Sequence, residues 1–372
     1  MSGRVPRLVC TAAVAAQAAF VPVAAVAVPG PQGPGQRSVA QLLTDLQKLY
    51  GQAEQATETY NATAERLKRQ RTEADRLDAA LGAARRALSD SRAQAARLAL
   101  QQYQGSSTGL SPYLRLLLAP DPQHALAEGH VIGQLARERA ETVKRLTRNE
   151  KKAADLAGKA REALDTRVAL TRRQQQARDD VRARLHDVEK LLASLSAEQV
   201  TALTRAETNG ITMAQRSFLA TGVLSGDRSP SREGDEAVRY AVRQLGKPYQ
   251  WGATGPQAYD CSGLTSQAWE HAGTPIPRTS QEQWARLKHI PLRDLRPGDL
   301  VVYFQEATHV ALYLGDGMVV QAPRPGTKVK VSPVAANPVL GAVRPDPGGE
   351  PLRRYTPPKL PRGALAGPDV SL

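Results

Sequence analysis

The longest pattern in the sequence is a repeat of apolar residues between Val39 and Gln104. This segment contains no proline, and its apolar positions recur in alternating steps of four and three residues. Fourteen of the seventeen repeat positions are apolar, as expected for a helix that packs lengthwise against another helix. The positions are Leu42, Leu46, Leu49, Ala53, Ala56, Tyr60, Thr63, Leu67, Gln70, Ala74, Leu77, Leu81, Ala84, Leu88, Ser91, Ala95 and Leu98. We therefore predict one long helix over this segment.

A second and weaker repeat extends from about residue 125 to residue 208. Its seam includes two arginines, Arg167 and Arg184, among the apolar positions. The segment from Gly105 to Pro122 separates the two repeats with several glycines and prolines. Two long helices around such a break predict a coiled-coil helical hairpin over residues 39–208. A parallel dimer would show the same heptads, so this alternative stays open.

The break between the two repeats also carries a cluster of apolar residues. The cluster consists of Leu110, Tyr113, Leu114, Leu116, Leu117 and Leu118. At the tip of a hairpin, such residues either dock a partner protein or fold back on the helices as a local core. The sequence favours neither alternative.

The composition changes after residue 208. Residues 209–232 are rich in Gly, Ser and Thr and are interpreted as a linker, and residues 346–372 are rich in Pro and Gly and are predicted to be disordered. Between them, residues 233–345 alternate short helical and strand patterns. A clear strand, residues 309–314, has apolar residues with period two and ends at a glycine-containing turn. Residues 233–345 are therefore predicted to form a separate α+β domain, with helices packed on a small antiparallel sheet.

The N-terminus has the features of an export signal. Arg4 and Arg7 precede an apolar run rich in Ala and Val, and a small-x-small sequence at residues 25–27 follows. Residues 1–28 are therefore predicted to be a signal peptide, followed by a linker at residues 29–38. An uncleaved anchor is the alternative because the run is long enough to span a bilayer. We favour cleavage, with no stable transmembrane anchor in the mature protein.

Composition and charge narrow the class of protein. The mean hydropathy of −0.41 excludes a polytopic membrane protein, and aromatic residues at only 4% indicate that much of the chain is not globular. The formal net charge is +14, and most of the excess lies in residues 1–232, with 34 Lys and Arg against 23 Asp and Glu. An exported basic protein meets wall polymers and lipid head groups, so we expect these polyanions as partners and not nucleic acid. A solvated helical face with an arginine bias is the alternative interpretation.

Cys261 is the strongest candidate for chemistry. The chain has two cysteines, and removal of the signal peptide leaves Cys261 without a partner for a disulfide. A helical pattern starts at Cys261 and ends near Gly273. At a helix N-terminus, free backbone amides and the helix dipole lower the pKa of a thiol. We therefore predict that Cys261 is a thiolate nucleophile.

A thiolate nucleophile needs a base, and the chain has six histidines. Elimination by position favours His309, at the start of the predicted strand, over His289 in a polar connection. The hairpin after this strand would bring Gln321 next to His309, so that the Gln321 amide oxygen holds the imidazole. Asp316 in the turn is the alternative third residue. No metal-ligand cluster is visible, and we expect neither a metal nor a cofactor.

Four separated motifs resemble one family. They are Asp260-Cys261-Ser262-Gly263-Leu264, Pro277-Arg278-Thr279-Ser280-x-x-Gln283, Gly298-Asp299-Leu300-Val301 and His309-Val310-Ala311-Leu312-Tyr313-Leu314-Gly315. In this order they closely resemble the NlpC-type cell-wall peptidases, which are papain-like cysteine peptidases. The resemblance covers residues 233–344, and a coiled coil before such a domain is similar to actinobacterial and firmicute wall hydrolases.

The resemblance implies a secreted, cell wall-associated endopeptidase that cleaves peptidoglycan stem peptides between D-glutamate, through its γ-carboxyl, and a diamino acid. It implies Cys261 as nucleophile, His309 as base and Gln321 as the third polar residue, where many members have His. It further implies that Tyr249, Asp260 and Ser262 line the substrate groove.

Two other functions stay open at this point. The same fold can act as an amidase or an acyltransferase. Alternatively, the chain is a non-catalytic coiled-coil scaffold or activator whose C-terminal domain only binds the wall. Resemblance to coiled-coil wall hydrolases also implies a candidate partner for the hairpin tip, the extracellular part of a division-associated membrane protein.

Overall fold

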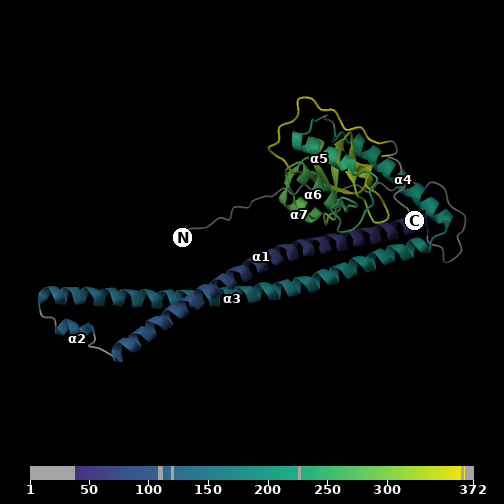
Figure 1. Ribbon diagram of the computed structural model, residues 1–372. Coiled ribbons are helices and arrows are strands. Elements are labelled where there is room, and N and C mark those ends of the chain that lie inside the picture. Colours follow the sequence, from purple (N-terminus) through teal and green to yellow (C-terminus); the bar gives the residue numbers. More distant parts are fainter. Residues whose placement is uncertain (1–37, 108–111, 119–120, 225–227, 362–363, 365–372) are drawn as a thin grey trace, which may run out of the picture. The chain divides into compact units, whose positions relative to one another are not determined.

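The structure describes both the helical and the globular part of the chain (Figure 1). The computed structural model describes residues 38–107, 112–118, 121–224, 228–361 and 364. The predicted signal peptide, residues 1–28, and residues 29–37 of the predicted linker lie outside the described residues. All helices and strands named below belong to one compact unit, Val39–Leu372. No described helix is both long enough and apolar enough to cross a membrane.

Two long helices pack against each other over part of their length (Figure 1). Helix α1 covers Val39–Ser107, and helix α3 covers Pro122–Ala193. Arg184 of α3 donates a hydrogen bond to Gln52 of α1. Asn149, which comes earlier on α3, donates to Ser91, which comes later on α1. The two helices therefore run antiparallel. The buried apolar residues of the two helices include Leu42, Leu46, Ala53, Ala56, Leu67, Ala74, Leu77, Leu81, Ala84, Ala153, Ala163, Val181 and Val188. Within this chain the two helices therefore form an antiparallel hairpin.

The connection between the two helices holds a short helix, α2 (Pro112–Leu117), which packs on α3. Leu114, Leu117 and Leu118 are 46%, 79% and 66% exposed, and Leu116 is half-buried. Leu114, Leu117 and Leu118 of the predicted tip cluster are therefore not buried in a local core. Leu110 lies outside the described residues.

The second helical run ends earlier than its sequence pattern predicts, and a further helix follows. Helix α4 (Ala197–Ala220) starts at Ser196, whose side chain and that of Gln199 form a reciprocal capping box. The prediction of a linker over residues 209–232 is therefore wrong for residues 209–220, which form the second half of α4. Gln215 explains this difference, because it donates to the carbonyl of Gly317 and accepts from an amide of the globular domain. These tertiary contacts outweigh the low helix propensity of the Asn-Gly pair at residues 209–210.

The globular domain consists of helices packed on an antiparallel sheet, as the sequence predicts. Its helices are α5 (Arg232–Arg243), α6 (Cys261–His271) and α7 (Ser280–Arg286), with short 3-10 turns at Leu292–Asp294 and Val334–Ala336. Its strands are β1 (Lys288–Ile290), β2 (Leu300–Tyr303), β3 (His309–Gly315), β4 (Met318–Gln321), β5 (Lys330–Pro333) and β6 (Val339–Arg344). The described strands form one sheet in the order β1-β6-β2-β3-β4-β5, and each neighbouring pair is antiparallel.

Both faces of the sheet are covered because its central strands are apolar on both sides. Helices α5 and α6 bury one face, where the fully buried Trp269 packs with Leu300 and Leu312. On the opposite face, Tyr303 and its neighbours form a second cluster that includes Phe218 of α4. The sheet is thus held between helices α5 and α6 on one side and helix α4 on the other.

The described part of the C-terminal segment lies against this domain. Arg296 forms an ion pair with Asp346 at 2.9 Å, and both side chains are buried. The amide of Leu352 donates to the carbonyl of Pro230. Residues 346–361 were predicted to be disordered. They form no helix or strand, but they contact the globular domain through this ion pair and this hydrogen bond. The Arg296–Asp346 ion pair holds the start of this segment against the domain, although a Pro- and Gly-rich composition alone predicts disorder.

Candidate active site

The site is built around the first turn of α6. Cys261 is the first residue of this helix, as predicted, and Asp260 is its N-cap. The Asp260 carboxylate accepts from the Gly263 amide at 2.6 Å and from the Gly252 amide at 2.9 Å. Gly263 lets the chain pass closely over the helix start, because a Cβ there would clash with the carbonyl of Ala253. Asp260 therefore fixes both the helix start and the preceding loop.

The thiol of Cys261 is not in the electrostatic environment that the sequence predicts. The side chain is 2% exposed, and its sulfur lies 3.8 Å from Oε1 of Glu58, a residue of α1. Burial raises the pKa of the Cys261 thiol well above its ordinary value, and the Glu58 carboxyl raises it further. The prediction of a lowered thiol pKa is thus wrong for the structure described, because a long-range carboxyl and burial outweigh the helix N-terminus.

His309 and Gln321 form the predicted pair. Nε2 of His309 lies 2.7 Å from the Gln321 amide oxygen, and both side chains are buried. Because an amide oxygen only accepts, Nε2 carries the proton and Nδ1 keeps the lone pair needed by a base. Burial lowers the pKa of His309 to about 4, although the Gln321 bond acts in the opposite direction. His309 is therefore neutral at pH 7 in this state.

The strand register explains why these two side chains meet. Strands β3 and β4 pair Leu312 with Val320 and Tyr313 with Val319, which is the register the sequence predicts along this part of the hairpin. Near the turn, a bulge pairs Gly315 with Met318, one residue away from the predicted partner. Extending the main register places Gln321 diagonal to His309.

The two alternative residues lie elsewhere. Asp316 is exposed in the turn, whereas His309 is fully buried, so Asp316 does not orient the imidazole. His289 lies in β1 at the edge of the sheet and is bonded at 2.7 Å to the backbone carbonyl of Trp284. His309 is the histidine that the structure joins to Gln321.

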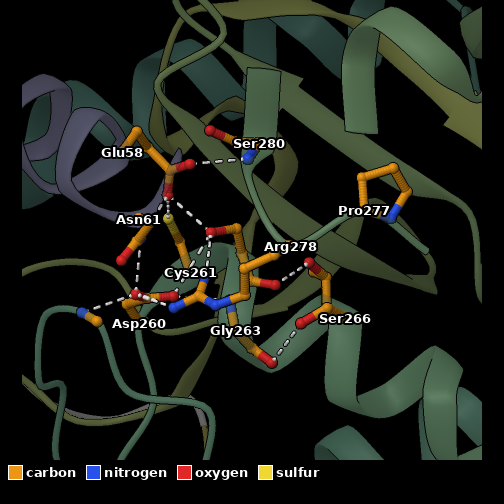
Figure 2. Close-up of polar contacts among 12 residues, drawn as sticks. Glu58, Asn61, Asp260, Cys261, Gly263, Ser266, Pro277, Arg278 and Ser280 are labelled. Carbon is orange, nitrogen blue, oxygen red and sulfur yellow. Dashed lines mark hydrogen bonds and ion pairs between the residues drawn. The ribbon is translucent and has the colours of Figure 1, made fainter. Parts of the chain in front are cut away.

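Helix α1 contributes three side chains that the sequence reasoning missed. Figure 2 shows Glu58 pointing at the sulfur of Cys261. One turn earlier, Oε1 of Glu54 lies 3.6 Å from Nδ1 of His309. One turn later, Asn61 donates to Asp260 at 3.0 Å. The partners of α1 thus include both candidate catalytic groups, Cys261 and His309.

The loop before α7 closes the other side of the site. Arg278 forms an ion pair with Asp260 at 2.7 Å and donates to Ser262 at 2.8 Å. The Ser280 amide donates to Glu58 at 2.9 Å. The Gln283 side chain ties this loop to α6 by donating to the backbone carbonyls of Ser262 and Pro277. The motif that contains Arg278 and Ser280 can be recognised in the sequence, but the sequence alone gave no role for either residue.

The three residues that the resemblance assigns to the groove lie at this site. Asp260 and Ser262 flank Cys261 and are fully buried. Tyr249 is 8% exposed and belongs to the same apolar cluster as Cys261. Asp260 and Ser262 are therefore direct neighbours of Cys261 in the chain, and Tyr249 packs in the cluster that contains it. Among the described residues, no group of His, Cys, Asp or Glu side chains is arranged to hold a metal ion.

Two known proteins are similar to about a third of this chain. A protein named probable endopeptidase from Corynebacterium glutamicum is 43% identical over 117 residues, which covers 31% of this chain and 56% of that protein. The peptidoglycan endopeptidase RipA of Mycolicibacterium smegmatis is 38% identical over 132 residues, with coverage of 31% of this chain and 26% of RipA. The match thus spans about half of the first relative and a quarter of the second.

A solved structure is similar to part of this chain, and a family model matches a defined range of its residues. The NlpC/p60 domain of the peptidoglycan hydrolase SagA is 32% identical, and the match covers 30% of this chain and 97% of that domain with a TM-score of 0.28. The model of the NlpC/P60 family matches residues 246–341. These residues include Cys261, His309 and Gln321. The C-terminal part of this chain is an NlpC/P60 domain.

Proposed function

We propose that this protein is a secreted, cell wall-associated cysteine endopeptidase that cleaves peptidoglycan stem peptides. The proposal rests on one arrangement: His309, bonded to Gln321 at 2.7 Å, lies under the same α1 face as Cys261, the first residue of α6. Relatives of this domain are named endopeptidases, and one is named a peptidoglycan endopeptidase. Export through residues 1–28 and the formal net charge of +14 fit a wall substrate.

The reaction follows from the roles of three residues. With α1 away, His309 takes the thiol proton and the Cys261 thiolate attacks the amide carbonyl carbon. The backbone amides at the start of α6 stabilise the oxyanion, and the His309 imidazolium protonates the departing amine as the C–N bond breaks. Water, deprotonated by His309, then attacks the thioester, and the C–S bond breaks to release a carboxylate and the thiol. Gln321 holds the imidazole in the required tautomer throughout.

The bond that we propose lies between D-glutamate, through its side-chain carboxyl, and a diamino acid. The groove residues are Tyr249, Asp260 and Ser262, and Arg278 supplies a cation next to them. For the hairpin, we propose a division-associated membrane protein as partner, because Leu114, Leu117 and Leu118 present an exposed apolar tip.

Mass spectrometry of digested peptidoglycan tests the proposal. Because the Glu58 carboxyl contacts Ser262 and the sulfur of Cys261, the wild-type chain and the Glu58→Ala variant are incubated with purified peptidoglycan side by side. An endopeptidase yields fragments with a new D-glutamate carboxyl and a new diamino acid amine. An amidase releases whole stem peptides from the glycan, and an acyltransferase yields products with a new amide bond. Binding without any product from either chain favours the non-catalytic scaffold.

Gln321→Ala is expected to lower kcat about 10-fold to 100-fold. His309→Ala is expected to lower it more, about 10²-fold to 10⁴-fold. The effect at Gln321 is smaller because Gln321 orients the base and is not itself the base. Gln321→His and Gln321→Asn are expected to retain more activity than Gln321→Ala, since both keep a polar partner for Nε2. Steady-state hydrolysis by the four variants, each in a chain that also carries Glu58→Ala, checks the ranking. Equal rates for Gln321→Ala and its parent would show that another group orients His309.

A further inference from the structure

A second groove lies at the other end of the sheet from the catalytic residues. Its walls come from the end of α4, the turn between β3 and β4, and the C-terminal segment Tyr355–Leu360, and we call it the tail groove. Its volume is about 700 Å³. His309 begins β3 and the turn follows the last residue of this strand, so the two lie about 20 Å apart along β3. The tail groove is therefore separate from the candidate active site.

We propose that the tail groove binds the glycan strand of peptidoglycan, a polymer of N-acetylated sugars. A strand bound there holds the polymer on the enzyme while the cleft around Cys261 acts on a stem peptide. The inference rests on the proposed function, because that function makes peptidoglycan the substrate.

Contacts within the chain fix the walls of the tail groove. Gln215 of α4 donates to the carbonyl of Gly317 in the turn at 3.0 Å. Gly317 has a φ of +69°, and a Cβ there would lie 3.2 Å from a methyl carbon of Leu219, so glycine lets the turn pack closely on α4. In the C-terminal segment, the carbonyl of Thr356 accepts from Arg239 of α5 at 3.0 Å. Walls that are already ordered lose little conformational entropy when a ligand binds.

The tail groove exposes apolar side chains. Leu219 is 46% exposed and Leu360 is 39% exposed, and both line the groove. Within the described residues 228–361, Leu360 is the one large apolar side chain that is exposed. Tyr313 and Tyr355 add aromatic rings to the lining. Aliphatic and aromatic side chains of this kind pack against the C–H faces of sugar rings and against acetamido methyl groups.

The charge of the lining selects among the polymers of a cell wall. Arg228 and Asp316 are its charged residues, one of each sign, and Arg228 is also paired with Asp294 at 2.8 Å. A phosphate-rich polymer needs an excess of cations, which this lining does not have. The carboxylate of Asp316 accepts hydrogen bonds from hydroxyl groups. A neutral ligand with apolar faces and many hydroxyls fits this lining, and a glycan strand is such a ligand.

The tail groove is not formed by the family domain alone. The family model matches residues 246–341. Helix α4 lies before this range, and the segment Tyr355–Leu360 lies after it. Two of the three walls are thus additions to the NlpC/P60 domain, and neither contributes a residue to the proposed chemistry.

A second binding point changes the action on a polymer more than the action on a small substrate. A polymer held at the tail groove presents its stem peptides to the cleft at a high effective concentration. A free stem peptide occupies the cleft alone and gains nothing from the groove. The ratio between the two activities therefore reports the groove.

Calorimetric titration of the full chain with the tetrasaccharide of N-acetylglucosamine tests the groove directly. Tyr355→Ala removes an aromatic wall and is expected to weaken binding about 10-fold. Leu360→Ser is expected to weaken binding as well. Because Leu360 is exposed, this second variant should keep the fold even if Tyr355→Ala loosens the C-terminal segment.

Two controls accompany these variants. Tyr355→Phe should bind like the wild type, because the Tyr355 hydroxyl is buried and has no hydrogen-bond partner among the described residues, while the ring is kept. Leu164→Ser makes the same change as Leu360→Ser at an exposed leucine of α3, outside the groove, and should leave binding unchanged.

Hydrolysis of polymeric peptidoglycan and of a soluble stem peptide is then compared in chains that also carry Glu58→Ala. Tyr355→Ala and Leu360→Ser are expected to lower the ratio of kcat/KM for the polymer to kcat/KM for the peptide about 3-fold to 10-fold, through a higher KM for the polymer. A merely structural role of these side chains would lower both activities alike and leave the ratio unchanged.

The two readouts separate the groove from the activity. Absence of tetrasaccharide binding, or equal binding by the wild type, Tyr355→Ala and Leu360→Ser, would overturn the glycan groove and leave the endopeptidase standing. Binding that depends on the groove, without hydrolysis of either substrate, would support the groove and overturn the proposed endopeptidase. A stem peptide that binds the groove in place of the tetrasaccharide would make it a peptide site and overturn its assignment to glycan.

Discussion

Cys261→Ala is expected to reduce peptidoglycan hydrolysis by about 10³-fold or more, because no other group in the proposed mechanism can form the thioester. The change should be made in a chain that also carries Glu58→Ala, so that the loss is measured against an open site. Release of soluble fragments from purified peptidoglycan, followed by mass spectrometry, gives the rate. The fold should be retained, since a small apolar side chain replaces a small buried one in the same cluster.

Cys261→Ser is the matched control for the same position. It keeps the size and the hydrogen-bonding capacity of the side chain but replaces a thiol by a much weaker nucleophile. We expect it to be nearly as inactive as Cys261→Ala while melting like its parent. Hydrolysis by Cys261→Ala at the parent rate would assign the chemistry to another residue and contradict a cysteine peptidase.

The local patterns of the sequence predict much of this structure. The apolar repeat predicts α1 to within a few residues, because a helix that packs lengthwise must place apolar residues on one stripe. Period-two alternation and a glycine turn predict the β3–β4 hairpin, and its register brings Gln321 to His309. These features depend on residues close in sequence, so a single chain is enough to find them.

The closed site could not be predicted in the same way. Glu54, Glu58 and Asn61 lie outside the apolar stripe of α1, and polar residues at such positions normally face solvent. Their partners are far away in the chain, with a separation of 199 residues for the Asn61–Asp260 contact and 203 residues for the Glu58–Cys261 contact. The sequence around a glutamate on a helical face does not show which distant residue its carboxyl will contact. The prediction of a lowered thiol pKa was wrong for the same reason, since it considered only the helix that Cys261 begins.

The extent of α4 shows another limit of local patterns. Its residues 209–220 begin with Asn-Gly, which indicates a break in a helix. The helix continues because Gln215 and Phe218 contact the globular domain, at Gly317 and in the cluster around Tyr303. Tertiary contacts thus decide the structure where intrinsic propensity is weak.

Asp260→Ala is expected to destabilise the NlpC/P60 domain by about 3 to 5 kcal/mol, because it leaves the guanidinium of Arg278 without its buried partner. It also removes the N-cap of α6 and the acceptor of the Gly252 amide. The protein has three tryptophans, Trp251, Trp269 and Trp284, and all lie in this domain. Tryptophan fluorescence during denaturation therefore reports the unfolding of this domain, while Trp251 also senses its contact with Tyr60 of α1.

Two further variants divide this loss between its causes. Asp260→Asn keeps an oxygen that caps α6 but has no charge for Arg278, so it should be more stable than Asp260→Ala by about 1 kcal/mol, the usual contribution of an N-cap. Asp260→Ala/Arg278→Leu removes both partners of the ion pair and should recover part of the loss, since the buried charge is gone. If Asp260→Ala unfolds at the same denaturant concentration as the wild type, the Asp260–Arg278 pair does not hold the start of α6. If the double variant is less stable than both single variants, the loss comes from packing and not from the unpaired charge.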